Sequence, residues 1–162
     1  MPWVKLTWSA LLLLAGALNA ATLQGKVIGV ADGDTLTLLD AQKNQHKIRL
    51  QGIDAPEKAQ AFGNKSKQSL HEMVHGKEVF VDVQKKDKYG RSVGKILVNQ
   101  TDACLEQIKR GMAWHYKQYA NEQSPEDRDV YAQAESTARA QSLGLWKDKS
   151  PTPPWAFRKQ NK

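Results

Sequence analysis

Short segments with the character of β-strands constrain the fold of this chain more than any other feature of its sequence. Residues 78–84 alternate so that Val79, Val81 and Val83 share one face, as they would in a strand with one buried side. Four more segments have a strand-like composition or are flanked by turn residues: residues 22–30, 34–39, 46–53 and 91–98. The sequence therefore predicts five short strands.

Three segments have the character of helices. Residues 62–75 carry an apolar stripe and end before Gly76, and residues 102–110 form a second candidate. The third, residues 125–142, follows Ser124, a good capping residue, and starts with a proline, which is favoured at the first helical position. Five strands and three helices in this order favour an α+β, mainly β fold: a five-stranded Greek-key barrel of the oligonucleotide/oligosaccharide-binding (OB) type.

Charged side chains gather in three ordered motifs. Residues 48–57 (IRLQGIDAPE) supply one arginine and two carboxylates, residues 32–35 (DGDT) precede them, and residues 87–91 (DKYGR) follow. Alone, each motif has an ordinary explanation, such as an Asp-Gly turn at residues 32–35. Among their residues are the three acidic groups and two arginines needed to hold a hard metal ion and grip a phosphodiester.

The composition is basic, with 24 Lys and Arg residues against 17 Asp and Glu and a net charge of +7. Such a surplus favours polyanionic partners such as DNA, RNA or an anionic membrane, although a solvated basic surface explains it equally well. The only cysteine, Cys104, excludes internal disulfides, and we expect it to be buried on the same helix face as Ile108.

The two ends of the chain differ from its centre. Residues 1–20 resemble a signal peptide, with cleavage after Ala20 or Ala21, so we expect export to a periplasm or out of the cell and no stable membrane association afterwards. The alternative is an uncleaved amphipathic anchor. Residues 21–146 form one domain, and residues 147–162 form a basic, proline-rich tail. The tail either adds nucleic-acid contacts through Trp155, Arg158 and Lys159 or, as we favour, packs its aromatic side chains on the domain in an extended polyproline conformation.

The three motifs together resemble the staphylococcal nuclease (thermonuclease) family, and in particular its secreted bacterial members. The resemblance is carried by residues 30–35 (VADGDT), 48–57 and 87–91, and later by residues 111–114 (GMAW) and 144–146 (GLW). It implies a five-stranded barrel with three helices and a calcium-dependent phosphodiesterase that acts on DNA or RNA.

The resemblance also implies a metal site and a catalytic set. Asp34, Asp54 and the backbone carbonyl of Ala55 match the calcium ligands, with Ala55 standing where the family usually has threonine. Glu57 matches the candidate general base that serves the attacking water. Arg49 and Arg91 match the two arginines that grip the phosphate, with planar guanidinium groups that lysine cannot copy.

Further positions match substrate contacts of the family. Lys88 and Tyr89 match residues at a terminal phosphate, Tyr119 matches a tyrosine near the base, and Lys117 stands where another tyrosine is expected. Stacking on an aromatic ring tolerates any base, which suits a nuclease of low sequence specificity that favours single strands. We expect a monomer. The alternative is a noncatalytic OB-type barrel that binds nucleic acid or protein, but such a protein should have lost some of the acids or arginines, and this chain keeps all five.

Overall fold

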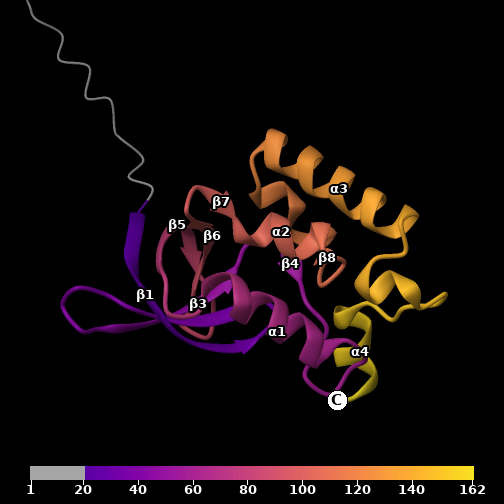
Figure 1. The fold of residues 1–162 in the computed structure, drawn as a ribbon, viewed down its shortest axis with the longest axis horizontal. Coiled ribbons are helices and arrows are strands. Elements are labelled where there is room, and N and C mark those ends of the chain that lie inside the picture. Colours follow the sequence, from indigo (N-terminus) through magenta and orange to yellow (C-terminus); the bar gives the residue numbers. More distant parts are fainter. Residues whose placement is uncertain (1–20) are drawn as a thin grey trace, which may run out of the picture.

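A closed barrel of five strands forms the centre of the computed structural model, which describes residues 21–162 (Figure 1). The predicted signal peptide lies outside the described residues. The barrel strands are β1 (Ala21–Asp32), β2 (Thr35–Leu39), β3 (Gln45–Leu50), β5 (Glu78–Lys86) and β6 (Ser92–Val98). Neighbours pair antiparallel in the order β3-β2-β1-β5-β6, and a parallel pairing of β3 with β6 closes the barrel. The predicted OB-type fold class is confirmed.

The barrel interior is filled by aliphatic side chains. Val79 and Val81 are fully buried, in agreement with the predicted alternation, and Ile48 and Leu50 point into the same core from β3. Gly94 in β6 faces a crowded spot, because a Cβ there would lie 2.5 Å from the carbonyl oxygen of Asp82. This close approach of backbones brings β5 and β6 together near the point where the barrel closes.

The strand predicted for residues 46–53 is wrong at its end. The chain leaves β3 after Leu50, turns at Gln51 and Gly52, and forms the short strand β4 (Ile53–Asp54), which pairs with β8 (Trp114–His115). Gly52 has a φ of 78°, a left-handed conformation that a glycine adopts without steric cost. The turn moves Asp54 off the barrel wall and toward the helices.

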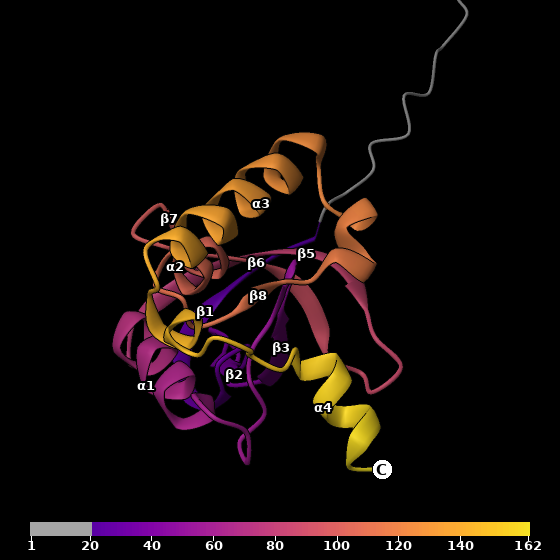
Figure 2. The ribbon, with the colours of Figure 1, turned by 90° about the vertical axis from the view of Figure 1, so that its right-hand side faces the viewer.

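Helices cover the barrel from several sides (Figures 1 and 2). α1 packs across β1, and α2 packs between β6 and α3. The α-helices are α1 (Gly63–Val74), α2 (Ala103–Lys109), α3 (Pro125–Ala140) and α4 (Pro154–Gln160); two 3-10 helices, η1 (Lys117–Glu122) and η2 (Gly144–Lys147), and the short strand β7 (Thr101–Asp102) complete the elements. Ser124 caps α3 through a hydrogen bond from the backbone N–H of Asp127, and Cys104 is buried in α2, both as expected.

The fourth helix, α4, departs from the tail conformation that the sequence favoured. The chain is extended up to Pro153 and then turns into a helix, which Figure 2 shows apart from α3. The expected aromatic packing is present: the Trp155 ring lies edge-on to Trp114 and stacks on Tyr116, with ring centroids 5.4 and 5.5 Å apart. The extended prediction fails for residues 154–160 because Pro154 stands at the first helical position, where its fixed φ is compatible with a helix. Within residues 21–162, no helix combines the length and apolar character needed to cross a bilayer.

Candidate active site

A cleft of about 760 Å³ collects most of the charged residues that the sequence singled out. It is lined by the β3–β4 segment, the hairpin between β5 and β6, η1 and α4. The predicted residues that line it are Asp34, Arg49, Asp54, Glu57, Lys88, Tyr89, Arg91 and Tyr119. The fold therefore brings the three sequence motifs into one place.

Asp34 is held at the start of β2 by the tight turn before it. The Asp32 carboxylate accepts a hydrogen bond from the backbone N–H of Asp34 at 3.0 Å. The Asp34 carboxylate in turn accepts one from the backbone N–H of Ala55 at 2.7 Å. Gly33 makes this junction possible, because a Cβ there would collide with Ser66 and with the Ala55 side chain. The two metal-ligand segments are thus joined directly.

Arg49 links the two predicted metal-binding carboxylates. Because Ile48 and Leu50 point into the core, the two-residue period of β3 places Arg49 on the opposite face. One of its terminal nitrogens, Nη2, lies 3.3 Å from Asp34 Oδ2 and 3.2 Å from Asp54 Oδ1. The other donates to the carbonyl oxygens of Leu50 and Ile53. The guanidinium is therefore fixed in position before any substrate arrives.

Glu57 lies beyond Asp54 on the irregular segment that leads to α1. Its backbone N–H donates to Gln60 Oε1 at 3.1 Å, and its carbonyl oxygen accepts from the backbone N–H of Gln60 at 2.8 Å. The side chain is 36% exposed, so water can reach the carboxylate. The carboxylate is therefore accessible from the cleft, although its Oε1 is paired with Arg158.

Arg91 comes from the end of the β5–β6 hairpin, next to Ser92, which pairs with Ile48 of β3. Its Nε donates to Asp87 Oδ2 at 2.7 Å, and Asp87 also accepts hydrogen bonds from the backbone N–H groups of Tyr89 and Arg91. The pKa of Asp87 is lowered: burial opposes the shift, but hydrogen bonds from Arg91 outweigh it. Asp87 thereby orients Arg91, which leaves its terminal nitrogens available for a phosphate.

The predicted substrate-contact residues do not all reach the cleft. Lys88 lies over the Tyr89 ring, which is 72% exposed, and Tyr119 lies beside Lys85. Lys117 does not line the cleft; its Nζ is 2.6 Å from Glu135 Oε1 on α3. Tyr116, which the sequence motifs did not assign to the substrate, lines the cleft instead.

One cleft residue that the sequence placed only among the tail residues is Arg158. Its Nη2 lies 2.9 Å from Asp54 Oδ2, and its Nη1 lies 3.1 Å from Asp54 Oδ1 and 2.7 Å from Glu57 Oε1. The basic tail was the available signal, but no local pattern shows which acid a distant arginine will meet.

Burial of several acids raises their pKa values. Burial, followed by the charge of Asp34, raises the pKa of Asp32 from 3.8 to about 7. Burial also raises the pKa of Asp54, although hydrogen bonds from Arg158 and the charge of Arg49 partly offset it. The cleft thus holds more negative charge than its own residues comfortably stabilise, as is usual where a cation binds.

The donor set suits calcium. Asp34 and Asp54 contact the same nitrogen of Arg49, so their oxygens are near each other, and the Ala55 carbonyl follows Asp54 directly. All these donors are oxygens, as a hard cation requires, and water completes such sites. Residues 21–162 contain no group of three or more acidic, histidine or cysteine side chains placed to hold a metal. The expected calcium site uses only two such side chains, those of Asp34 and Asp54, together with a backbone carbonyl. The absence of a larger group within residues 21–162 is therefore compatible with this site.

Comparison with known proteins identifies relatives along nearly the whole chain. The family model described as staphylococcal nuclease homologue matches residues 47–148. An uncharacterized endonuclease of Haemophilus influenzae is 39% identical over 161 residues, which cover 98% of this chain and 87% of that protein. Protein ParB of Escherichia coli is 36% identical over 150 residues (87% of this chain, 82% of that protein). A micrococcal nuclease of Shigella flexneri is 33% identical over 163 residues (95% and 91%).

Proposed function

The chain belongs to the staphylococcal nuclease family and is a nuclease, and we propose that it is an exported, calcium-dependent enzyme that hydrolyses DNA and RNA with little sequence preference. The observation that carries the proposal is the meeting of two arginines and three carboxylates in one cleft: Arg49, Arg91, Asp34, Asp54 and Glu57. A noncatalytic binding protein would not need this combination.

Asp34, Asp54 and the carbonyl of Ala55 would hold the calcium ion. When bound, the ion neutralises phosphate charge and raises the fraction of hydroxide in the attacking water. Asp34 lies just before β2 and Ala55 just after β4, and the hydrogen bond between them holds the two ligand segments together.

Arg49 and Arg91 would hold the scissile phosphate from two sides. As charge develops on the phosphoryl oxygens in the transition state, a guanidinium donates two hydrogen bonds that strengthen with that charge. Arg49 is fixed by two backbone carbonyls and two carboxylates, and Arg91 by Asp87. Arg91 is oriented in advance with its terminal nitrogens available, which lowers the cost of reaching the transition state. Arg49 is held in place too, but its Nη2 would donate to the phosphate only after calcium has taken over the two carboxylates that it contacts.

Glu57 would accept a proton from the attacking water or orient it. Its exposed carboxylate lies on the same side of the cleft as Asp54. In the present structure, its Oε1 is paired with Arg158, so this ion pair must open before Glu57 can serve a water molecule.

The rim of the cleft supports a preference for unpaired bases. Tyr89 and Tyr119 are exposed there, at 72% and 40%, and such rings stack on bases of any identity. A duplex hides the faces of its bases, so we propose that single strands are cut faster. The mature chain, with 23 basic and 17 acidic residues after residue 20, would draw the polyanion to the cleft as a monomer.

Degradation of single-stranded DNA by residues 21–162 tests the proposal, with calcium and then with a chelator. Glu57→Gln preserves the shape of the side chain but removes the charge, and Glu72→Gln is the matched control, since Glu72 is an exposed acid on α1 that contacts Gln68. We expect calcium-dependent cleavage that falls about 10²-fold or more in Glu57→Gln and stays unchanged in Glu72→Gln. Binding of DNA without cleavage in any divalent metal would overturn the enzyme.

Export is tested separately, on the full chain of 162 residues expressed in a bacterium. We expect the mature protein outside the cytoplasm, with an N-terminus at residue 21 or 22 by mass spectrometry. A full-length protein that stays with the membrane would support the uncleaved anchor instead.

A further inference from the structure

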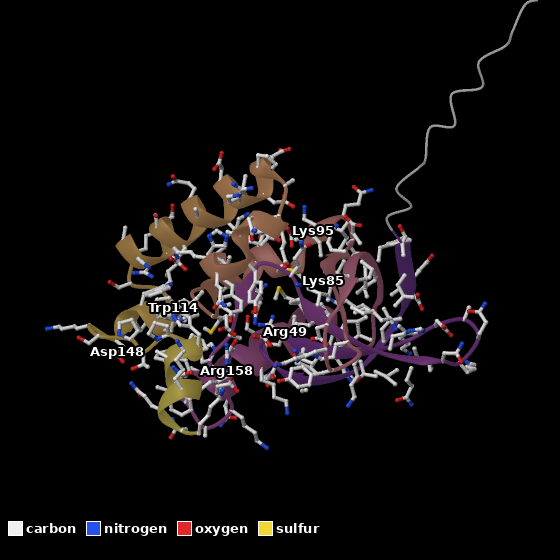
Figure 3. All side chains as sticks on the ribbon, turned by 180° about the vertical axis from the view of Figure 1, so that it is seen from behind. Arg49, Lys85, Lys95, Trp114, Asp148 and Arg158 are labelled. Atoms are coloured by element: carbon white, nitrogen blue, oxygen red, sulfur yellow. The ribbon has the colours of Figure 1, made fainter. Side chains whose placement is uncertain are left out.

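The C-terminal helix places a positive charge on the acids that the proposed function assigns to calcium and water. Arg158 forms a two-pronged ion pair with Asp54, whose side chain is 1% exposed, and one of its nitrogens also contacts Glu57. Figure 3 shows Arg158 and Arg49 approaching the same region from α4 and from the barrel. Among the residues that line the cleft, Arg158 comes from the part of the chain most distant in sequence, 104 residues from Asp54.

The tail is docked on the domain by contacts outside the cleft. Trp155 packs between Trp114 and Tyr116, and Pro154 is buried. Ahead of the helix, the side-chain amide of Gln60 donates to the carbonyl oxygen of Thr152 at 2.5 Å. These contacts fix the start of α4, and Arg158 lies one helical turn beyond it.

The negative charge of the nearby carboxylates explains why the positively charged Arg158 side chain lies at this point. Four carboxylates line the cleft on the side of Asp54: Asp32, Asp34, Asp54 and Glu57. Arg49 is the cation that the barrel itself supplies to Asp34 and Asp54. Burial alone would lower the pKa of Arg158, but its hydrogen bonds to Asp54 and Glu57 outweigh this and raise it, so the side chain stays charged.

We propose that Arg158 occupies the place of the calcium ion and sets the calcium affinity of the site, because calcium can bind Asp54 only after Arg158 withdraws. Calcium ligands lie at about 2.3–2.6 Å, whereas both oxygens of Asp54 already accept hydrogen bonds from Arg158. A guanidinium and a divalent ion on the same two oxygens would also repel each other strongly. The inference rests on the proposed function only in taking Asp54 as a calcium ligand.

The competition has two consequences. The apparent Kd for calcium is the intrinsic value divided by the fraction of molecules in which Arg158 is withdrawn. Withdrawal also releases Glu57, since the same guanidinium holds it. Calcium would therefore complete the metal site and make the proposed base available in one step. Where calcium is scarce, Arg158 would stay paired with Asp54 and Glu57.

Calorimetric titration of residues 21–162 with calcium, without nucleic acid, tests the competition. We expect Arg158→Gln to bind calcium about 10-fold more tightly than the wild type, which is the usual strength of a hydrogen bond to a charged group. Arg158→Lys, which keeps the charge but loses the two-pronged geometry, should lie between them. Lys159→Gln removes the same charge from the exposed neighbouring position and is the matched control; it should change the Kd less than twofold.

The outcomes separate this inference from the proposed function. Calcium binding that is equal or weaker in Arg158→Gln than in Lys159→Gln would overturn the role of Arg158, while the calcium site itself would stand. Absence of calcium binding in every variant would overturn both. Circular dichroism in chelator should show all the variants folded, because Arg158 is 37% exposed and lies outside both hydrophobic clusters.

Hydrogen exchange gives a second readout that does not depend on any substitution. We expect saturating calcium to increase amide exchange in residues 154–160 of the wild type and to decrease it around residues 54–57. Unchanged exchange in α4 with calcium bound at the site would overturn the inference, because Arg158 would then have no need to move.

Discussion

Two arginines reach Asp54 from different parts of the molecule, and they are held very differently. Arg49 extends from a strand inside the closed barrel, its side chain is 13% exposed, and it contacts two carboxylates and two backbone carbonyls. Arg158 extends from a short helix near the end of the chain and is 37% exposed. The same carboxylate is therefore held by one closely anchored partner and by a second that is anchored more loosely.

The packing beneath the two arginines differs in the same way. The barrel core consists mainly of fully buried aliphatic residues from several paired strands, whose loss affects the whole fold. The tail rests on a smaller cluster rich in tryptophan, made by Trp114, Ala138, Leu145 and Trp146, with Trp155 packed against it. Local opening needs little free energy where few buried contacts must break, so the tail can move while the barrel stays folded.

The largest effect should come from changing the arginine of the barrel. In Arg49→Lys the charge remains but the planar fork is lost, so we expect kcat/KM for single-stranded DNA to fall roughly 10²–10³-fold at saturating calcium. Steady-state cleavage assays measure this, with Lys159→Gln as a control that keeps its activity. A loss below threefold would show that Arg49 holds the metal-site acids without contacting the phosphate.

The next prediction, with a smaller expected effect, compares how much the barrel and the tail each contribute to the free energy of unfolding. Ile48→Ala empties a fully buried position of the barrel and should lower the free energy of unfolding by about 2–5 kcal/mol. Trp155→Ala removes the ring that packs on Trp114 and Tyr116, and each of these aromatic pairs should contribute only about 0.5–1.5 kcal/mol. Urea unfolding followed by circular dichroism compares the two variants, and equal decreases would show that the tail is an integral part of the fold.

The smallest expected effect is a pH dependence of the free energy of unfolding that comes from His115. This residue supports the segment between the barrel and the tail. Burial lowers the pKa of His115, and its Nε2 lies 2.8 Å from Gln123 Oε1, with Glu135 and Lys117 nearby. The unfolded chain takes up a proton near pH 6.5 and the folded chain only at lower pH, so the contribution of His115 to stability declines as the pH falls below about 6.5. The raised pKa of Asp32 acts in the opposite direction, because its folded form takes up a proton at a higher pH than its unfolded form.

The variant His115→Gln cannot take up that proton, so lowering the pH from about 7 to 5 should destabilise it less than it destabilises the wild type, or stabilise it more. The backbone N–H of His115 donates to Glu135 in the wild type, and the substitution leaves this backbone group in place. An equally steep profile in the variant would assign the pH dependence to another group.

The predictions from sequence succeeded where one short segment carries its own physical signal. The alternation of Val79 and Val81, the cap at Ser124 and the burial of Cys104 each depend on neighbours in the chain, and each is found in the structure. The prediction failed at residues 51–52, where a turn at Gly52 sends Ile53 and Asp54 to pair with β8. That pairing joins segments some 60 residues apart, and nothing within residues 46–53 encodes it.

By itself, the sequence determined the five barrel strands to within a few residues at their ends, the α-helices before the tail and the chemical groups of the three motifs, because side-chain period, turns and caps act over a few residues. Only the tertiary structure decided which polar and charged groups interact. The backbone N–H of Ala55 donates to Asp34, and Lys117 pairs with Glu135. Arg158 pairs with Asp54 and Glu57. Which charged groups interact depends on how close they are in space, and these groups come close only once the barrel has closed and the tail has docked.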